Sequence, residues 1–138
     1  MLNITRPLPT IDDDSRPFWE STKQHAMKLQ RCNRCESFWF YPGPVCHHCG
    51  STDFQWVQVA GTGTIYSYTV LQRAKGNPFE NDVPIAIALI RLTEGPVLMS
   101  NLFDYDADHL RIGLPVEVAY EDVNDEVTLA IFRPQVNL

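Results

Sequence analysis

Two Cys-x-x-Cys pairs constrain this chain more than any other feature. Cys32 and Cys35 form the first pair, Cys46 and Cys49 form the second, and the sequence contains no other cysteine. A Cys-x-x-Cys turn places both sulfur atoms on one side of a tight knuckle, so two facing knuckles supply the four thiolates of a tetrahedral metal site. The spacing therefore predicts a small metal-stabilised ribbon over residues 31–56.

Disulfide bonds are the alternative for four cysteines in a secreted protein. We expect thiolate ligands instead, because the N-terminal residues have neither the basic start nor the apolar stretch of a signal peptide. One zinc ion per chain is the expected occupant, and iron, bound as in a rubredoxin-like electron carrier, stays open. Four thiolates leave no vacant coordination position, so the ion would be structural and would not activate water.

The residues that flank the knuckles differ between the two pairs. Gly50 follows the second pair and suits a turn position with positive φ, whereas Glu36 occupies the equivalent place after the first pair. The sequence thus predicts a less favourable first knuckle. His47 and His48 lie inside the second knuckle, where we interpret them as exposed spacer residues rather than ligands.

Charge is unevenly distributed along the chain. Residues 1–56 hold six basic and six acidic side chains, whereas residues 57–138 hold five basic and eleven acidic ones, so the second part carries the whole formal net charge of −6. Phosphate binding depends on clustered Lys and Arg, so this polarity argues against a nucleic-acid partner. No apolar run approaches the roughly 20 residues that span a bilayer, and we expect a cytoplasmic protein with no membrane partner.

A short helical segment is expected within residues 1–30. Asp14 or Ser15 can cap a helix with Pro17 in its first turn, and the apolar positions then share one face at helical spacing as far as Leu29. Phe18 and Trp19 are large apolar residues on this helix, and they are our candidates for a partner interface. Packing of both side chains on the ribbon or on the next domain is the alternative.

The pattern changes to strands after the ribbon. Residues 54–72 alternate as one long strand pair with Gly61 and Gly63 at bulges or bends, and four further strands follow within residues 84–93, 96–103, 115–121 and 127–133. A helical turn within residues 106–113 interrupts them. The predicted fold is therefore mainly β, with a rubredoxin-like zinc ribbon followed by a five-stranded OB-fold barrel over residues 57–138.

The order of these motifs resembles a known family. The segments RCNRC, YPGPVCHHCGS, GTGTIYSYTV, DVPIAIALIRLTEGPVLMSNL, LRIGLPVEVAYED and IFRP are similar to the zinc-ribbon plus OB-fold family of acyl-CoA-associated proteins, long described as a domain of unknown function. The resemblance covers nearly the whole chain to Pro134. The family's four cysteines correspond to the four here, and the departure is Glu36, where many relatives carry Gly.

The resemblance implies a non-catalytic accessory subunit that forms a hetero-oligomer with an acyl-CoA enzyme. Such partners include thiolases, acyltransferases, lipid-transfer-type aldolases and hydratases, some in lipid or steroid breakdown. The residues agree with a non-catalytic role, because all cysteines are expected to bind metal and the four histidines lie in no recognisable Ser-His-Asp or Cys-His setting. A single-stranded nucleic-acid-binding OB fold and a rubredoxin-like electron carrier are the alternative functions.

Acyl-CoA binding would need cations for the phosphates and an apolar groove for the remaining arm. The available cations are Arg31 and Arg34, near Lys28, on the ribbon, and Arg73 and Lys75 in the long polar loop of residues 71–84. Trp39 and Phe40, between the knuckles, are candidates to stack on the adenine, and packing between ribbon and barrel is the alternative for both.

Overall fold

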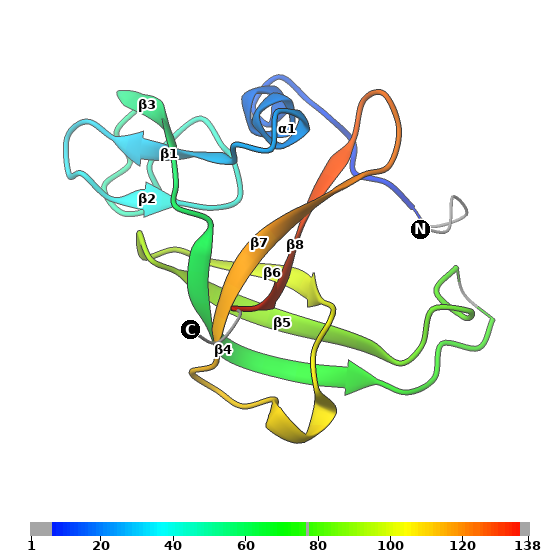
Figure 1. The fold of residues 1–138 in the computed structure, drawn as a ribbon. Helices are drawn as coiled ribbons and strands as arrows, with labels where there is room; N and C mark the ends of the chain where they lie inside the picture. Colours follow the sequence, from blue (N-terminus) through cyan, green and yellow to red (C-terminus); the bar gives the residue numbers. More distant parts are fainter. Residues whose placement is uncertain (1–6, 77, 136–138) are drawn as a thin grey trace.

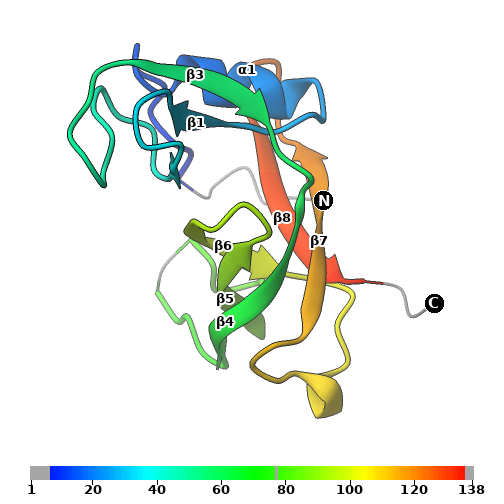
Figure 2. The same cartoon turned by 90° about the vertical axis from the view of Figure 1, so that its left-hand side faces the viewer.

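The computed structural model describes residues 7–76 and 78–135, so the outer ends of the first and last predicted segments and Asn77 of the polar loop lie outside it. The described part contains one α-helix, a three-stranded sheet and a closed five-stranded barrel. The helix and the small sheet lie together at one end of the barrel, and the short 3₁₀ helix η1 (Ala107–His109) lies at the opposite end (Figures 1 and 2). A ribbon followed by a five-stranded barrel was predicted, and the structure confirms it.

Helix α1 (Arg16–Lys23) is shorter than the sequence pattern predicts. It begins after Ser15, whose backbone N–H donates to the Asp12 carboxylate while its hydroxyl accepts from the Asp12 N–H. It ends at Lys23, and His25, two residues later, has a φ of 57°. The Ala26 N–H donates to the Ser21 carbonyl and the His25 N–H to that of Thr22, the pattern of a left-handed helix end. The predicted helical face through Leu29 is therefore wrong.

Three short antiparallel strands form the ribbon sheet. Strand β1 (Lys28–Cys32) lies between β2 (Phe38–Trp39) and β3 (Phe54–Gln58). Leu29, expected on the helix, instead pairs with Val57 of β3. The side chain of Gln30 donates to and accepts from the backbone of Gly43, which fixes the loop between the two knuckles.

The barrel strands follow in the order β4-β5-β6-β8-β7. They are β4 (Thr62–Leu71), β5 (Ile85–Leu92), β6 (Val97–Leu102), β7 (Pro115–Asp122) and β8 (Thr128–Pro134). All neighbours are antiparallel except β6 and β8, which pair in parallel at Leu102 and Phe132. One parallel contact that closes an otherwise antiparallel five-stranded barrel is the arrangement of an OB fold.

The long strand pair predicted for residues 54–72 is divided between the two sheets. Strand β3 completes the ribbon and β4 opens the barrel, with the chain turning at Gly61, whose φ is 78°. The expected bend is therefore confirmed at Gly61, whereas the bulge in the β4–β5 register lies at Tyr66, between Ile65 and Ser67. Gly63 has a different constraint: a Cβ atom there would lie 2.4 Å from the Arg91 carbonyl oxygen.

One apolar core joins the helix, the ribbon and the barrel. Phe18 of α1, Met27 and Leu29 pack with Ile90 and Phe132 of the barrel. The Met27 N–H also donates to the hydroxyl of Tyr120 on β7. The helix and the ribbon therefore cover one open end of the barrel. Among the described helices, none has the length and apolar character needed to cross a membrane.

Candidate metal centre and binding surfaces

The two cysteine knuckles have the same backbone geometry. Each begins with a buried cysteine, Cys32 or Cys46, whose sulfur accepts two backbone N–H groups at 3.3–3.5 Å. In each, the residue four positions later donates its N–H to the carbonyl of the first cysteine at 3.0 Å. Those later residues are Glu36 and Gly50, both with positive φ. The first knuckle therefore has the same set of hydrogen bonds as the second.

The four sulfur atoms converge as a tetrahedral zinc site requires. They all lie within 4.8 Å of one another, and the Sγ atoms of Cys32 and Cys49, and of Cys35 and Cys46, are 3.6 Å apart. Tetrahedral coordination with Zn–S bonds of about 2.3 Å places neighbouring sulfurs about 3.8 Å apart. The cysteines thus fit one structural zinc ion with no open position.

The thiols differ in acidity before a metal binds. The Ser37 hydroxyl and backbone N–H lower the pKa of the Cys35 thiol to about 6. The Ser51 N–H lowers the pKa of the Cys49 thiol, but burial and the hydrogen bonds shared with the other three thiols raise it to about 11. Metal binding at neutral pH must therefore displace protons, so the affinity for zinc decreases as the pH falls.

Three of the four candidate aromatic residues are buried, and Phe40 is partly buried. Phe18 and Trp19 are 3% and 7% exposed, so the expectation that they offer an exposed surface to a partner is wrong, and the packing alternative holds. The reason is that Phe18 contacts Trp19 and Phe40 edge to face at 4.9 and 5.3 Å, between the helix and the ribbon. Trp39 is 2% exposed and packs on Cys32, Cys46 and Phe54, which leaves no ring face for an adenine.

The candidate cations form two separate groups. Arg31 is partly buried and lies 3.6 Å from the Glu36 carboxylate, and Arg34 is exposed in the first knuckle. Arg73 and Lys75 are exposed in the loop between β4 and β5. Figure 1 shows that loop and the ribbon on opposite sides of the molecule. The two groups therefore do not form one phosphate site in this chain.

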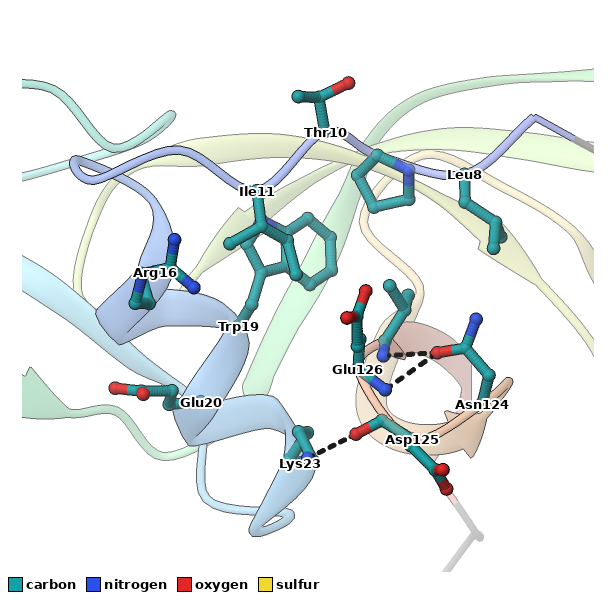
Figure 3. A pocket seen from close by; sticks show the side chains of 12 residues that line it. Leu8, Thr10, Ile11, Arg16, Trp19, Glu20, Lys23, Asn124, Asp125 and Glu126 are labelled. Atoms are coloured by element: carbon teal, nitrogen blue, oxygen red, sulfur yellow. Dashed lines mark hydrogen bonds between the residues drawn. The ribbon is translucent and has the colours of Figure 1, made fainter.

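A pocket of about 530 Å³ separates α1 from the turn between β7 and β8 (Figure 3). Its apolar wall includes Trp19 and Ile11, and Lys23 donates to the carbonyl of Asp125 across one end. Two cations and three carboxylates line it: Arg16, Lys23, Glu20, Asp125 and Glu126. This balance is unfavourable for the phosphates of a nucleotide.

A second hollow, of about 600 Å³, lies between the ribbon and the β5–β6 turn. Glu36 and Glu94 line it together with His47 and His48. Within the described residues, the indole N–H of Trp39 and one carboxylate oxygen of Glu94 are buried without a hydrogen-bond partner. The other Glu94 oxygen accepts from the Ala60 N–H in the ribbon-to-barrel linker. The two carboxylates make this hollow a poor phosphate site as well.

Sequence inspection missed a polar cluster that ties the end of the helix to the barrel. The Asp122 carboxylate accepts from the buried Thr128 hydroxyl at 2.7 Å and contacts the His25 imidazole at 3.0 Å. His25 also stacks on Tyr120. In a catalytic triad the histidine lies between nucleophile and carboxylate, whereas here the carboxylate lies between the other two. The cluster is therefore a structural tether.

Comparison with known proteins also divides the chain into a ribbon and a barrel, with the boundary inside β3. Residues 19–55 match the family description "ChsH2, rubredoxin-like zinc ribbon domain". Residues 56–121 match "ChsH2, C-terminal OB-fold domain". The first match includes all four cysteines, which identifies the metal centre as a zinc ribbon.

Relatives with curated descriptions include subunits and scaffold proteins. A probable enoyl-CoA hydratase alpha subunit of Thermomonospora curvata is 41% identical over 95% of this chain, which spans only 40% of that relative. A DUF35 domain-containing scaffold protein of Methanocaldococcus jannaschii is 29% identical, over 70% of this chain and 68% of its own length.

A solved structure matches this chain over nearly its whole length. A chain of the complex titled "Ltp2-ChsH2(DUF35) aldolase" is 40% identical to this protein. The match covers 94% of this chain and 100% of that one, with a TM-score of 0.81. This protein therefore belongs to the ChsH2 (DUF35) family of zinc-ribbon and OB-fold proteins.

Proposed function

We propose that this chain is a non-catalytic accessory subunit that docks on a larger acyl-CoA enzyme and helps to position its thioester substrate. The observation that carries this proposal is the 40% identity to a chain of the solved Ltp2-ChsH2(DUF35) aldolase, over the full length of that chain. The partner would belong to the thiolase superfamily, as a thiolase, an acyltransferase or a lipid-transfer-type aldolase. The hydratase relatives favour a hydratase as the second candidate partner. The assembly would act in the cytoplasm.

The chemistry of the described residues favours positioning over bond making. The four cysteines are zinc ligands with no open coordination position, and the Asp122 cluster has the wrong order for proton transfer to a nucleophile. Holding a substrate in a reactive geometry accelerates a reaction without contributing a reacting group. The partner would therefore supply the nucleophile and the base.

The loop between β4 and β5 is our candidate for contact with the phosphates of acyl-CoA. In OB folds the loop between the first two strands is one of the ligand-binding loops, and here it carries Arg73 and Lys75 as exposed cations. On the ribbon, Arg31 already faces Glu36. Contact at the loop would leave the acyl arm free to reach into the partner.

Co-expression with an Ltp2 chain tests the accessory role directly. We expect a stable complex on size-exclusion chromatography, and cleavage of an acyl-CoA aldol substrate that is faster with this chain than with Ltp2 alone. Turnover by this chain alone would contradict the proposal, and so would an Ltp2 chain that neither binds it nor responds to it. A hydratase partner is tested in the same way with enoyl-CoA.

The phosphate contact is tested with two charge reversals. The double variant Arg73→Glu, Lys75→Glu should raise the KM for acyl-CoA in the complex about tenfold or more, since charge-assisted contacts are lost. Arg34→Glu, an exposed reversal on the ribbon, should leave the KM unchanged. If both variants raise the KM equally, the cause is the overall charge of the protein. If the loop variant leaves the KM unchanged, the loop does not contact the substrate.

The two rival functions have direct tests. A single-stranded nucleic-acid binder requires a basic groove lined with aromatic residues, and tight salt-dependent binding of an oligonucleotide would support that function. An electron carrier would bind iron in the ribbon, which gives the purified protein colour and a reversible redox wave. We expect a colourless protein with one zinc ion per chain.

A further inference from the structure

The outer face of the first three barrel strands has an unusual composition. We define the β4–β6 face by the outward apolar side chains of these strands, between which the outward polar residues Ser67, Thr69 and Asn101 also lie: Leu71, Ile85, Ile87, Leu89, Val97 and Met99. On β5 the alternate residues point inward and are fully buried, whereas Ile85, Ile87 and Leu89 remain partly exposed. A strand that faces solvent on one side normally alternates apolar and polar residues, and a strand that is apolar on both sides is usually covered on both.

Strand pairing places the apolar stripe of β5 beside apolar residues at two points, whereas Ile87 between them lies opposite Thr69 and Asn101. Leu89 of β5 lies opposite Ser67 of β4 on one side and Met99 of β6 on the other. Met99 is 68% exposed, which is unusual for an apolar residue in the middle of a strand. Ile85 pairs with Leu71, so the same surface extends to the start of the β4–β5 loop.

The β4–β6 face is also nearly free of charge, although the barrel as a whole is acidic. Arg91 is the one ionisable Lys, Arg, Asp or Glu side chain in strands β4, β5 and β6, all of which are fully described. The adjoining outer surface of β7 and β8 instead carries Glu117 in an ion pair with Arg133, as expected for a solvent-facing sheet. The outer surfaces of β4–β6 and of β7–β8 therefore differ in charge.

Arg91 lies at one end of the β4–β6 face and would favour a negative charge on a surface that covers it. Its guanidinium lies 4.9 Å from the centre of the Tyr66 ring, and Tyr66 is 51% exposed. None of the described ion pairs includes Arg91. A surface that covers this face would match it with apolar side chains and with a carboxylate near Arg91.

We propose that the β4–β6 face is the surface that docks the partner enzyme, through an apolar patch of the partner that presents an acidic residue to Arg91. This inference rests on the accessory role proposed above. The second and third strands of an OB fold form its usual ligand face, and a single cation there does not suit nucleic acid. A second copy of this chain would bring two acidic barrels together, which charge repulsion disfavours.

Three single substitutions test the assignment against an Ltp2 chain. Met99→Glu and Arg91→Glu place a negative charge on the β4–β6 face, and each should raise the Kd of the complex at least about tenfold. Ile112→Glu is the matched control, because Ile112 is 69% exposed and lies outside the three strands. Calorimetric titration gives the affinities, and thermal melting of each free variant checks that it is folded.

Hydrogen–deuterium exchange of the wild-type complex provides a measurement without mutation. Backbone amides of β5 and β6 should exchange at least about tenfold more slowly in the complex than in the free chain. If Met99→Glu and Arg91→Glu both bind the partner as tightly as the wild type does, the docking face is wrong and the accessory role stands. The same conclusion follows if Ile112→Glu weakens binding as much as they do. A wild-type chain that binds neither Ltp2 nor a hydratase partner would overturn both. If the wild type forms a homodimer that Met99→Glu dissociates, the β4–β6 face binds a second copy of this chain instead of the partner enzyme.

Discussion

Glu36 and Gly50 occupy equivalent positions at the ends of the two cysteine knuckles. Their φ angles are 66° and 76°, and each donates its backbone N–H at 3.0 Å to the carbonyl of the cysteine four residues earlier. Glycine adopts this left-handed conformation without steric cost, whereas a residue with a Cβ atom does not. The metal-binding geometry is therefore imposed on Glu36 by the rest of the knuckle.

Replacing Glu36 with glycine should stabilise the zinc-bound protein. The expected gain in the free energy of unfolding is about 1 kcal/mol, because the left-handed strain is removed. The contact between Glu36 and Arg31 is exposed and contributes little. Urea denaturation at constant zinc concentration measures the change. Gly50→Ala should shift the midpoint in the opposite direction, and equal responses of the two positions would contradict the comparison.

Replacing Cys46 with serine should release the metal and unfold the ribbon. Cys46 is buried, and its sulfur accepts two backbone N–H groups besides facing the other thiols. In so small a unit most of the metal-binding energy is folding energy. Zinc content and near-ultraviolet circular dichroism report the loss. His47→Ala is the control, and it should retain one zinc ion. Retention of zinc by Cys46→Ser with an unchanged melting curve would disprove the prediction.

Truncating Phe18 should destabilise the whole protein rather than a partner contact alone. Phe18 is buried among Trp19, Phe40 and Tyr41, where the helix meets the ribbon. Phe18→Ala should therefore lower the free energy of unfolding by about 3–5 kcal/mol. Tyr66→Ala, at an exposed aromatic residue on the barrel, should change it by about 0.5 kcal/mol or less. Similar losses at both positions would be inconsistent with the core that we describe.

Asp122 should make stability depend on pH below about pH 4. Hydrogen bonds from His25 and then from Thr128 hold the pKa of the Asp122 carboxyl below its ordinary value of 3.8. A lowered pKa in the folded state means that the unfolded chain binds the proton more readily. The carboxylate therefore stabilises the fold above about pH 4, and this contribution is lost as the pH falls through the folded-state pKa.

Comparison of wild type with Asp122→Asn isolates that contribution. The wild type should be more stable at pH 6, and the two unfolding free energies should converge as the pH decreases below 3.8. Zinc loss in acid affects both proteins, so the difference between them is the informative quantity. Asp125→Asn is the control, because its carboxylate takes part in neither of these hydrogen bonds. A difference that stays constant with pH would contradict the assignment.

Local sequence patterns identified features that depend on spacing. The two Cys-x-x-Cys pairs determined the knuckles, because the distance between the cysteines of each pair is fixed by a few backbone torsions. The alternation of β5 and β6 indicated strands, because inward and outward positions repeat every two residues. Apolar periodicity failed at Leu29, because a hydrophobic residue three or four positions after a helical one fits a buried strand equally well.

The sequence by itself determined the zinc ligands, the ribbon and the barrel class, since each depends on short-range spacing and on turn residues. Only the tertiary structure decided which surfaces are available. It buried Phe18, Trp19 and Trp39, separated the ribbon cations from those of the β4–β5 loop, and left Met99 exposed. Exposure depends on which distant segments pack over a side chain, and an aromatic residue has the same local sequence signature whether it fills a core or faces a partner.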